Sequence, residues 1–276
     1  MKRLVLFSLL FVSFILPMRA QQSNTIPAPE EIKAANDSIL AEAYRLYLHE
    51  KVAWILEDIV YQTYEDAMNN ADGWVPISED GIKVKGVFYN KERTKALYEA
   101  SINIQTGEAS SSDSVRDLTA DELEEIEVHQ RVVNAVRSLE SIPSCPEGCT
   151  FNIEAIQIDD NLYRVYWMLG TSQSGIIPFG SDFSYDCDAE GNIKEVRRYH
   201  KSYIPTPTSM DGGGKVSLIV HSHTSICPYI SPTDIALFLL YGYESAGLTQ
   251  FKVLSTALKC YFVFDAESYE ISVEER

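Results

Sequence analysis

The chain has 276 residues, of which 45% are hydrophobic and 23% charged, and its formal net charge is −17. Such an acidic chain is not expected to bind nucleic acid or anionic lipid, because neutralising phosphates requires clustered lysine and arginine. The length is sufficient for one large domain or two small ones.

The first twenty residues have the pattern of a secretory signal peptide. A basic start, Met1–Arg3, precedes the apolar segment Leu4–Leu16, and Ala20 offers a small residue for cleavage before Gln21. We therefore expect residues 1–20 to be removed and the mature chain to be exported to the periplasm or the extracellular space. No later apolar run is long enough to cross a bilayer, so no membrane span is expected in the mature chain.

Residues 21–117 predict an N-terminal helix followed by a β-hairpin. Apolar side chains recur three and four positions apart over residues 36–69, which indicates one amphipathic helix. Its aromatic residues could form a binding face, although such a stripe more often belongs to a core. Two alternating segments, 82–90 and 97–104, are typical of paired strands. The stretch 108–117 is rich in serine and charge, which is typical of a loop and marks the expected domain boundary.

Residues 118–276 predict a second helix and then a series of short strands, which we treat as a C-terminal domain. Thr119 and Glu122 have the spacing of a capping box, and the helix is expected to continue to about Leu139. Strands are expected near residues 151–158, 162–169, 176–179, 183–187, 193–204, 216–223, 250–255, 260–265 and 270–273, with a helix at 234–243. This order indicates an α+β fold with a mixed, mostly antiparallel sheet.

Two of the five histidines, His221 and His223, lie one residue apart at the end of the apolar run Val216–Val220. Residues i and i+2 of a strand point to the same face, so the two imidazoles are expected to project side by side. Asp234 follows eleven residues after His223 and begins the expected helix. Two imidazoles and one carboxylate form a three-ligand set that leaves a fourth zinc position open, which is typical of catalytic zinc.

This spacing, His-x-His followed by seven residues and Ser-x-x-Asp, resembles the zinc signature of the JAMM/MPN (JAB-like) metalloprotease family. The resemblance covers residues 215–265. It implies that His221, His223 and Asp234 are metal ligands and that zinc is the cofactor. Ser231 would then be a catalytic residue that supports the tetrahedral intermediate. A JAMM-like α/β domain acting on a protein or peptide substrate is also implied.

Two positions depart from the family pattern. Thr224 follows the second histidine, where the family usually has proline. The family's upstream glutamate, its general base, has no counterpart before Trp167–Gly170, where Tyr163 and Arg164 stand. Glu154 is the substitute candidate for this catalytic role. We expect an exported zinc-dependent hydrolase. Because zinc can bind without a base while hydrolysis is slow or absent, a non-catalytic secreted or envelope binding protein is the alternative.

The motif residues also fit a segment without metal. A His-x-His pair can be hydrogen-bonded on a strand, and Thr233 or Asp234 can cap the following helix, with Pro232 at its start. A cysteine protease that uses Cys227 is a further alternative, although nothing marks its thiol as activated. An interaction module whose aromatic N-terminal helix binds a partner is the third class.

The five cysteines allow disulfides in an exported protein. Cys145 and Cys149 could close a tight loop, and a Cys227–Cys260 bridge would restrain the segment between the candidate ligands. Spacing alone does not fix the connectivity, and the odd number leaves at least one free thiol or an intermolecular bond.

His129 and His200 lie outside the motif. His200 belongs to a basic segment of an expected strand, where it could hold an anionic group of a substrate but more often balances nearby carboxylates. His129 falls among glutamates of the second helix, where a solvated side chain is favoured. The glycine-rich segment 205–214 is interpreted as a surface connection, with a substrate-side flap as the alternative.

Overall fold

The computed structural model describes residues 27–78, 82–113, 115–139, 144–210, 214 and 216–276. The expected signal peptide at residues 1–20 therefore lies outside the described residues. The elements are helices and mostly antiparallel sheets, which confirms the α+β class. None of the described helices combines the length and the hydropathy needed to cross a membrane.

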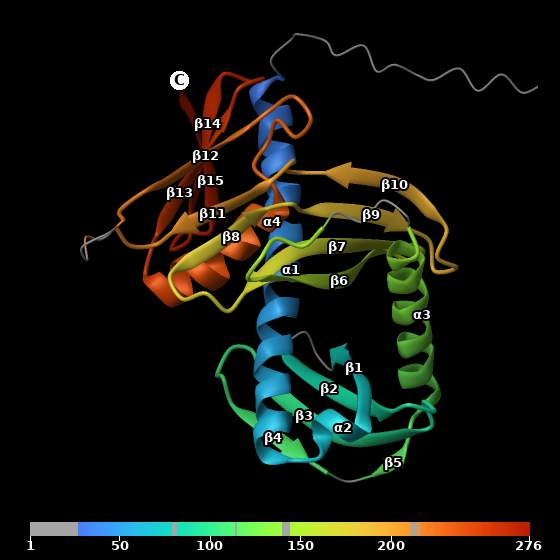
Figure 1. Cartoon of the computed structure of the whole chain (residues 1–276). Helices are drawn as coiled ribbons and strands as arrows, with labels where there is room; N and C mark the ends of the chain where they lie inside the picture. The colour runs from blue at the N-terminus through green and yellow to red at the C-terminus, as the bar shows by residue number, and fades with distance from the viewer. Residues whose placement is uncertain (1–26, 79–81, 114, 140–143, 211–213, 215) are drawn as a thin grey trace, which may run out of the picture.

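The long helix α1 (Pro29–Thr63) runs through the length of the molecule (Figure 1). It begins seven residues before the start that periodicity predicted, because Pro29 suits the first turn of a helix and acidic residues follow it there. Its first half contributes Leu46 to a core shared with the C-terminal sheet, and its second half contributes Leu56 to the core of the N-terminal sheet. The boundary expected at residue 117 stays a prediction, and α1 belongs to the cores on both sides of it.

After the short helix α2 (Ala67–Asn70), an antiparallel N-terminal sheet has the strand order β1-β2-β3-β4, with β5 paired to β3. Its strands are β1 (Ala71–Ser78), β2 (Lys83–Asn90), β3 (Lys95–Asn103), β4 (Ala109–Ser112) and β5 (Arg116–Asp117). The expected hairpin is confirmed as β2 and β3. The interpretation of 108–117 as a loop is wrong, because the backbones of β4 and β5 pair with β3. The side chains of this segment are polar and mostly exposed.

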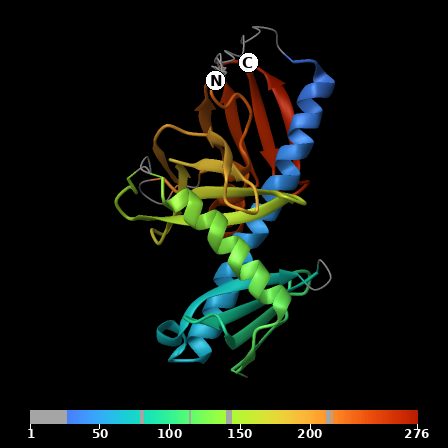
Figure 2. The same ribbon diagram turned by 90° about the vertical axis from the view of Figure 1, so that its right-hand side faces the viewer.

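The helix α3 (Ala120–Arg137) begins at the predicted capping box. The Thr119 backbone N–H donates to Glu122 Oε2 at 2.9 Å, and the Glu122 backbone N–H donates to Thr119 Oγ1 at 3.2 Å. The helix then packs Val132 and Val136 against Val165 of the middle sheet. Figure 2 shows α3 passing from the N-terminal sheet to the middle sheet beside α1.

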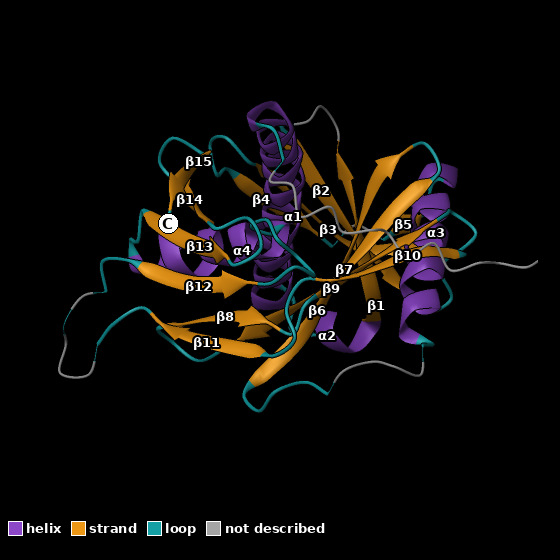
Figure 3. Ribbon diagram, turned by 90° about the horizontal axis from the view of Figure 1, so that it is seen from above, coloured by secondary structure: helices purple, strands orange, loops and turns teal. Residues whose placement is uncertain are grey.

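Three further sheets follow, and Figure 3 shows the middle and C-terminal sheets to either side of α1. The middle sheet, in the order β10-β9-β7-β6, consists of β6 (Cys149–Asp159), β7 (Leu162–Thr171), β9 (Phe183–Cys187) and β10 (Ile193–Arg198). A two-stranded sheet pairs β8 (Ile176–Gly180) with β11 (Tyr203–Pro207). The C-terminal sheet, β12 to β15 in order, consists of β12 (Ile219–His223), β13 (Gln250–Ser255), β14 (Cys260–Asp265) and β15 (Glu270–Glu275).

The C-terminal sheet and its helix fix the positions of the candidate ligands. The strands β12 and β13 are parallel, and the crossover between them contains α4 (Pro232–Leu237), which continues as the π-helix η1 (Phe238–Glu244). Phe238 and Phe251 pack ring to ring at 4.7 Å, which holds η1 against β13. The expected single strand 193–204 is wrong, because it divides into β10 and β11 around His200.

Candidate metal centre

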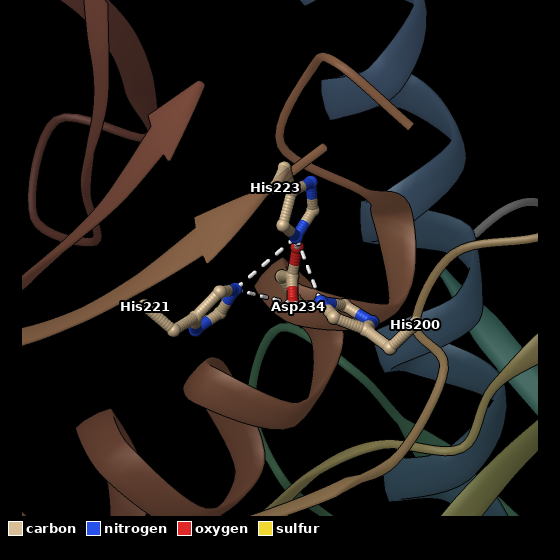
Figure 4. Close-up of side chains that lie close together, drawn as sticks. All are labelled: His200, His221, His223 and Asp234. Atoms are coloured by element: carbon tan, nitrogen blue, oxygen red, sulfur yellow. Dashed lines mark hydrogen bonds and ion pairs between the residues drawn. The ribbon is translucent and has the colours of Figure 1, made fainter. Parts of the chain in front are cut away.

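Four side chains of metal-ligating type converge at one end of β12 (Figure 4). One ligand atom from each lies within 4.8 Å of all the others, the residues being His200, His221, His223 and Asp234. Two of them come from β12, one from the first turn of α4 and one from the segment between β10 and β11. The structure therefore contains a group that could hold a metal ion.

Local structure places three of the four side chains. Strand alternation puts His221 and His223 on one face of β12, with ring centroids 5.2 Å apart. Asp234 is the third residue of α4, and Ser231 is the N-cap that accepts from its backbone N–H at 3.1 Å. The helix cap is therefore Ser231, not Thr233 or Asp234 as the alternative without metal supposed, while Pro232 stands at the helix start as expected.

Most distances between the ligand atoms are close to those that one small ion requires, and the one between His200 and His223 is shorter. The His223 Nε2 lies 3.2 Å from the Nε2 of His221 and 2.7 Å from that of His200. The two Asp234 oxygens each lie 3.2 Å from one imidazole nitrogen, Oδ1 from His221 and Oδ2 from His223. A tetrahedral zinc ion with bonds of about 2.0–2.1 Å spaces its ligand atoms about 3.3–3.4 Å apart.

Two of the three imidazoles are oriented by a hydrogen bond at their other nitrogen. His200 Nδ1 donates to Asp182 Oδ1 at 2.7 Å, and His223 Nδ1 donates to the carbonyl oxygen of Tyr229. A proton fixed on Nδ1 leaves the Nε2 lone pair for a metal, and such outer contacts are characteristic of metal-binding histidines. Thr233 in turn donates its hydroxyl to Asp182, which holds that carboxylate in place.

The centre also contains buried polar atoms that the protein leaves without hydrogen bonds. Among the described atoms, Asp234 Oδ1 and His221 Nδ1 have no hydrogen-bond partner. Asp234 Oδ1 lies 3.2 Å from His221 Nε2 and 3.5 Å from His200 Nε2 without a hydrogen bond, and a metal ion at the centre would give this buried carboxylate oxygen a direct positive partner. The donor set and this oxygen therefore fit a bound cation.

The charges of the centre depend on one another. Burial alone would lower the pKa of the histidines, but Asp182 and Asp234 outweigh it and raise the pKa of His200 to about 9. The pKa of His223 rises to about 10 against burial, mainly through Asp234. Burial would raise the pKa of Asp234, yet the three imidazoles hold it well below its usual value. A metal ion would replace the imidazole protons as the positive partner of Asp234.

The centre is closed to solvent. The exposed fraction of the His200 side chain is 4%, that of His221 is 5% and that of His223 is 0%. Four protein ligands and so little exposure differ from the three-ligand set that the sequence predicted. The difference arises from His200, which tertiary folding brings in from a separate segment.

The other predicted site residues have different environments. Ser231 is buried, and its hydroxyl donates to Asp234 Oδ2 at 2.8 Å, so it supports a ligand of the centre. Glu154 on β6 lies 3.5 Å from His49 Nδ1 on α1, and its described contacts include none with the four-residue centre. Its role as a general base stays a prediction that this position does not support.

The cysteines take no part in disulfides in this structure, where all five are free thiols. Cys227 Sγ donates to the carbonyl oxygen of Tyr229, and Cys260 is buried on β14. The Cys227–Cys260 bridge is therefore not formed. The segment before Ser231 is restrained by hydrogen bonds to His223 and Cys227 that meet at Tyr229.

No family model, curated protein or solved structure matches this chain. The resemblance to the JAMM/MPN family stays a prediction from the spacing of the motif.

Proposed function

We propose that this protein is an exported zinc-binding protein whose zinc ion is held by His200, His221, His223 and Asp234 and serves a structural purpose. The observation that carries the proposal is the convergence of four buried ligand atoms, one of them from the carboxylate of Asp234, whose Oδ1 has no hydrogen bond. A structural zinc site is closed by four protein ligands, whereas a catalytic one keeps a position open. Substrate would have to reach side chains that are almost fully buried.

The chemistry of the donor set favours zinc over the alkaline-earth ions. Three imidazole nitrogens and one carboxylate oxygen suit zinc, whereas calcium and magnesium prefer oxygen ligands in larger numbers. The spacing of the ligand atoms is also near that of a tetrahedron. Other first-row ions compete for nitrogen sites, so the metal is identified by measurement.

Bound zinc would join three separate segments of the chain. It would link β12 to the first turn of α4 and to the segment between β10 and β11. Because the unfolded chain does not hold these ligands together, the free energy of metal binding adds to the free energy of folding. The non-catalytic binding protein of the sequence alternatives is thus the function we favour, and its partner would bind elsewhere on the surface.

Zinc-dependent hydrolysis is the second candidate, and the pair formed by Asp182 and His200 favours it. In this alternative His221, His223 and Asp234 would hold the zinc ion, which would supply Lewis-acid activation of the attacking water. His200, oriented by Asp182 at 2.7 Å, would then take up a proton at Nε2 in place of the glutamate that the motif lacks. Ser231 would orient Asp234 through its hydrogen bond.

Metal analysis of the purified protein tests the proposal. We expect about one zinc ion per chain in the wild type and loss of most of it in His223→Ala, because four-coordinate sites depend on every ligand. His49→Ala is the matched control, since His49 lies on α1 and pairs with Glu154. A wild-type protein that contains no zinc after growth with zinc would refute the proposal.

The variant His200→Ala separates the two candidates. If His200 is a ligand, the variant loses zinc and stability together. If it is the proton acceptor of a hydrolase, the variant keeps zinc near its wild-type content and loses cleavage of peptide and isopeptide substrates. Wild-type protein that is loaded with zinc and cleaves none of these substrates would exclude the second candidate for them.

A further inference from the structure

A cavity of about 650 Å³ lies between α1, α3, the strands β1 and β2, and the strands β6 and β7. Its volume is within the range of sites that bind small molecules. It is lined by residues of both the N-terminal sheet and the middle sheet, so it exists only where the two halves of the chain meet. The metal ligands are not among its lining residues.

Part of the lining of this cavity is apolar. It includes Trp74 and Pro76 from β1, Val84 from β2, and Leu48 and Val52 from α1. Trp74 is anchored, because its indole N–H donates to Glu57 Oε1 at 3.1 Å and its ring stacks on Phe88. An immobilised indole beside aliphatic side chains suits a flat or aliphatic molecular body.

The lining also contains carboxylates and imidazoles. Glu125 and His129 lie one turn apart on α3, and His49 of α1 also lines the cavity. His49 Nδ1 lies 3.5 Å from Glu154 Oε2, a further carboxylate next to this imidazole. The surroundings are therefore rich in hydrogen-bond acceptors and negative charge.

The cationic side chain of the cavity already has a partner. Arg45 donates from its guanidinium to the carbonyl oxygen of Gln157, and it is the one lysine or arginine among the described lining residues. Asp121 and Glu125 give the lining residues two carboxylates against this single cation. An anionic ligand would be repelled, whereas a cationic ligand would neutralise the excess.

We propose that this cavity binds a small organic ammonium compound with an apolar body. The ammonium group would donate hydrogen bonds to Glu125 and to the neighbouring imidazoles, and the apolar body would pack against Trp74. Burial raises the pKa of Glu125 although His49 opposes the shift, and burial lowers the pKa of His129 although Glu154 opposes it, as expected where loss of water outweighs the charged neighbours. The inference is independent of the metal centre.

Calorimetric titration of the full mature protein with three matched probes tests the chemistry. Phenethylamine, phenethyl alcohol and phenylacetate share one aromatic body and differ in the charge of the head group. We expect the amine to bind at least about tenfold more tightly than the alcohol, since a charged hydrogen bond is worth more than a neutral one. The acid should bind least. Equal affinities for amine and acid, or no binding of the amine, would overturn the proposal.

Two glutamate variants of α3 test whether the ammonium group of the ligand contacts Glu125. Glu125→Gln removes a lining carboxylate and should weaken binding of phenethylamine by about tenfold while leaving that of the alcohol unchanged. Glu127→Gln, on the exposed face of the same helix, is the matched control and should bind like the wild type. Equal weakening by both variants would mean that only the overall charge matters and would refute the assignment. Circular dichroism of both variants checks that α3 remains folded.

Discussion

The metal centre and the α1–α3 cavity contain the same kinds of side chain but are built in opposite ways. At the centre, three imidazoles and one carboxylate lie within 4.8 Å of one another and are almost fully buried. In the cavity, His49, His129 and Glu125 line an open space, and no second group of metal-ligating geometry occurs among the described residues. Residue type alone therefore does not determine whether a site binds a metal ion or a small molecule.

The difference comes from how the backbone places the side chains. The centre is built on a strand whose register against β13 is fixed and on a helix start whose cap is Ser231. The cavity lies where two helices and two sheets meet, between elements whose buried side chains belong to separate core clusters. Metal coordination needs positions fixed to a fraction of an ångström, which the first arrangement supplies.

Removal of one imidazole should have the largest effect at the centre and little effect at the cavity. His223→Ala should lower the free energy of unfolding by about 3–5 kcal/mol, because it leaves Asp234 buried without that partner. His49→Ala, in the half-buried lining of the cavity, should change it by less than about 1 kcal/mol. Urea denaturation followed by circular dichroism measures both. Equal losses in the two variants would remove the distinction between the regions.

Chelation should loosen the centre without affecting α3. A metal at a concentration about a hundred times its Kd stabilises the folded state by about 2.7 kcal/mol, and a chelator should abolish this contribution. Amide hydrogen exchange with and without chelator should show faster exchange in β12 and around Ser231, with α3 unchanged. Uniformly faster exchange through both regions would show that the chain responds as one unit.

The pH dependence of the free energy of unfolding should reveal a buried carboxylate in the middle of α1. Glu50 is buried near the cavity, accepts a hydrogen bond from Asn152 at 2.9 Å and has an unpaired Oε1. Burial and then Glu154 raise its pKa from 4.5 to about 8. The folded state therefore binds more protons than the unfolded state between these values, and stability should fall as pH rises through this window.

Glu50→Gln should remove this dependence, because the amide stays neutral at every pH and can still accept from Asn152. We expect the variant to be more stable than the wild type by about 1–3 kcal/mol above pH 8 and similar to it near pH 4.5. Asp58→Asn, exposed on the same helix, is the control. A wild-type protein whose stability is constant across this range would contradict the buried charge at Glu50.

The sequence predicts those ligands of the centre that lie close together along the chain. The alternation of a strand places His221 beside His223, and the Ser-x-x-Asp spacing places Asp234 in a capped first turn. His200 was interpreted as part of a basic strand, and nothing in its neighbours marks it as a ligand. It reaches the centre because the chain leaves β10 there and Asp182, eighteen positions earlier, binds its ring.

The fold shows the same contrast between features with local sequence signals and features that depend on distant segments. The hairpin β2–β3 and the helix α3 were predicted because their signals, alternation and a capping box, lie within a few residues. The strand β4 was missed because its polar side chains are mostly exposed and only its backbone pairs with β3. The cavity could not be predicted, since it depends on how α1 and α3 cross the two sheets.

The smallest effect we predict is on stability and lies at the start of α3, whose first turns contain the lining carboxylates Asp121 and Glu125. Thr119→Ala removes the hydroxyl that accepts from the Glu122 backbone N–H at 3.2 Å and should lower the free energy of unfolding by about 1 kcal/mol. Thr119→Ser keeps the acceptor and should restore most of this loss. Binding of phenethylamine should weaken in Thr119→Ala alone, while its zinc content stays at the wild-type value. A fall in zinc content would mean that the two regions are coupled through α1, which contributes side chains to both cores.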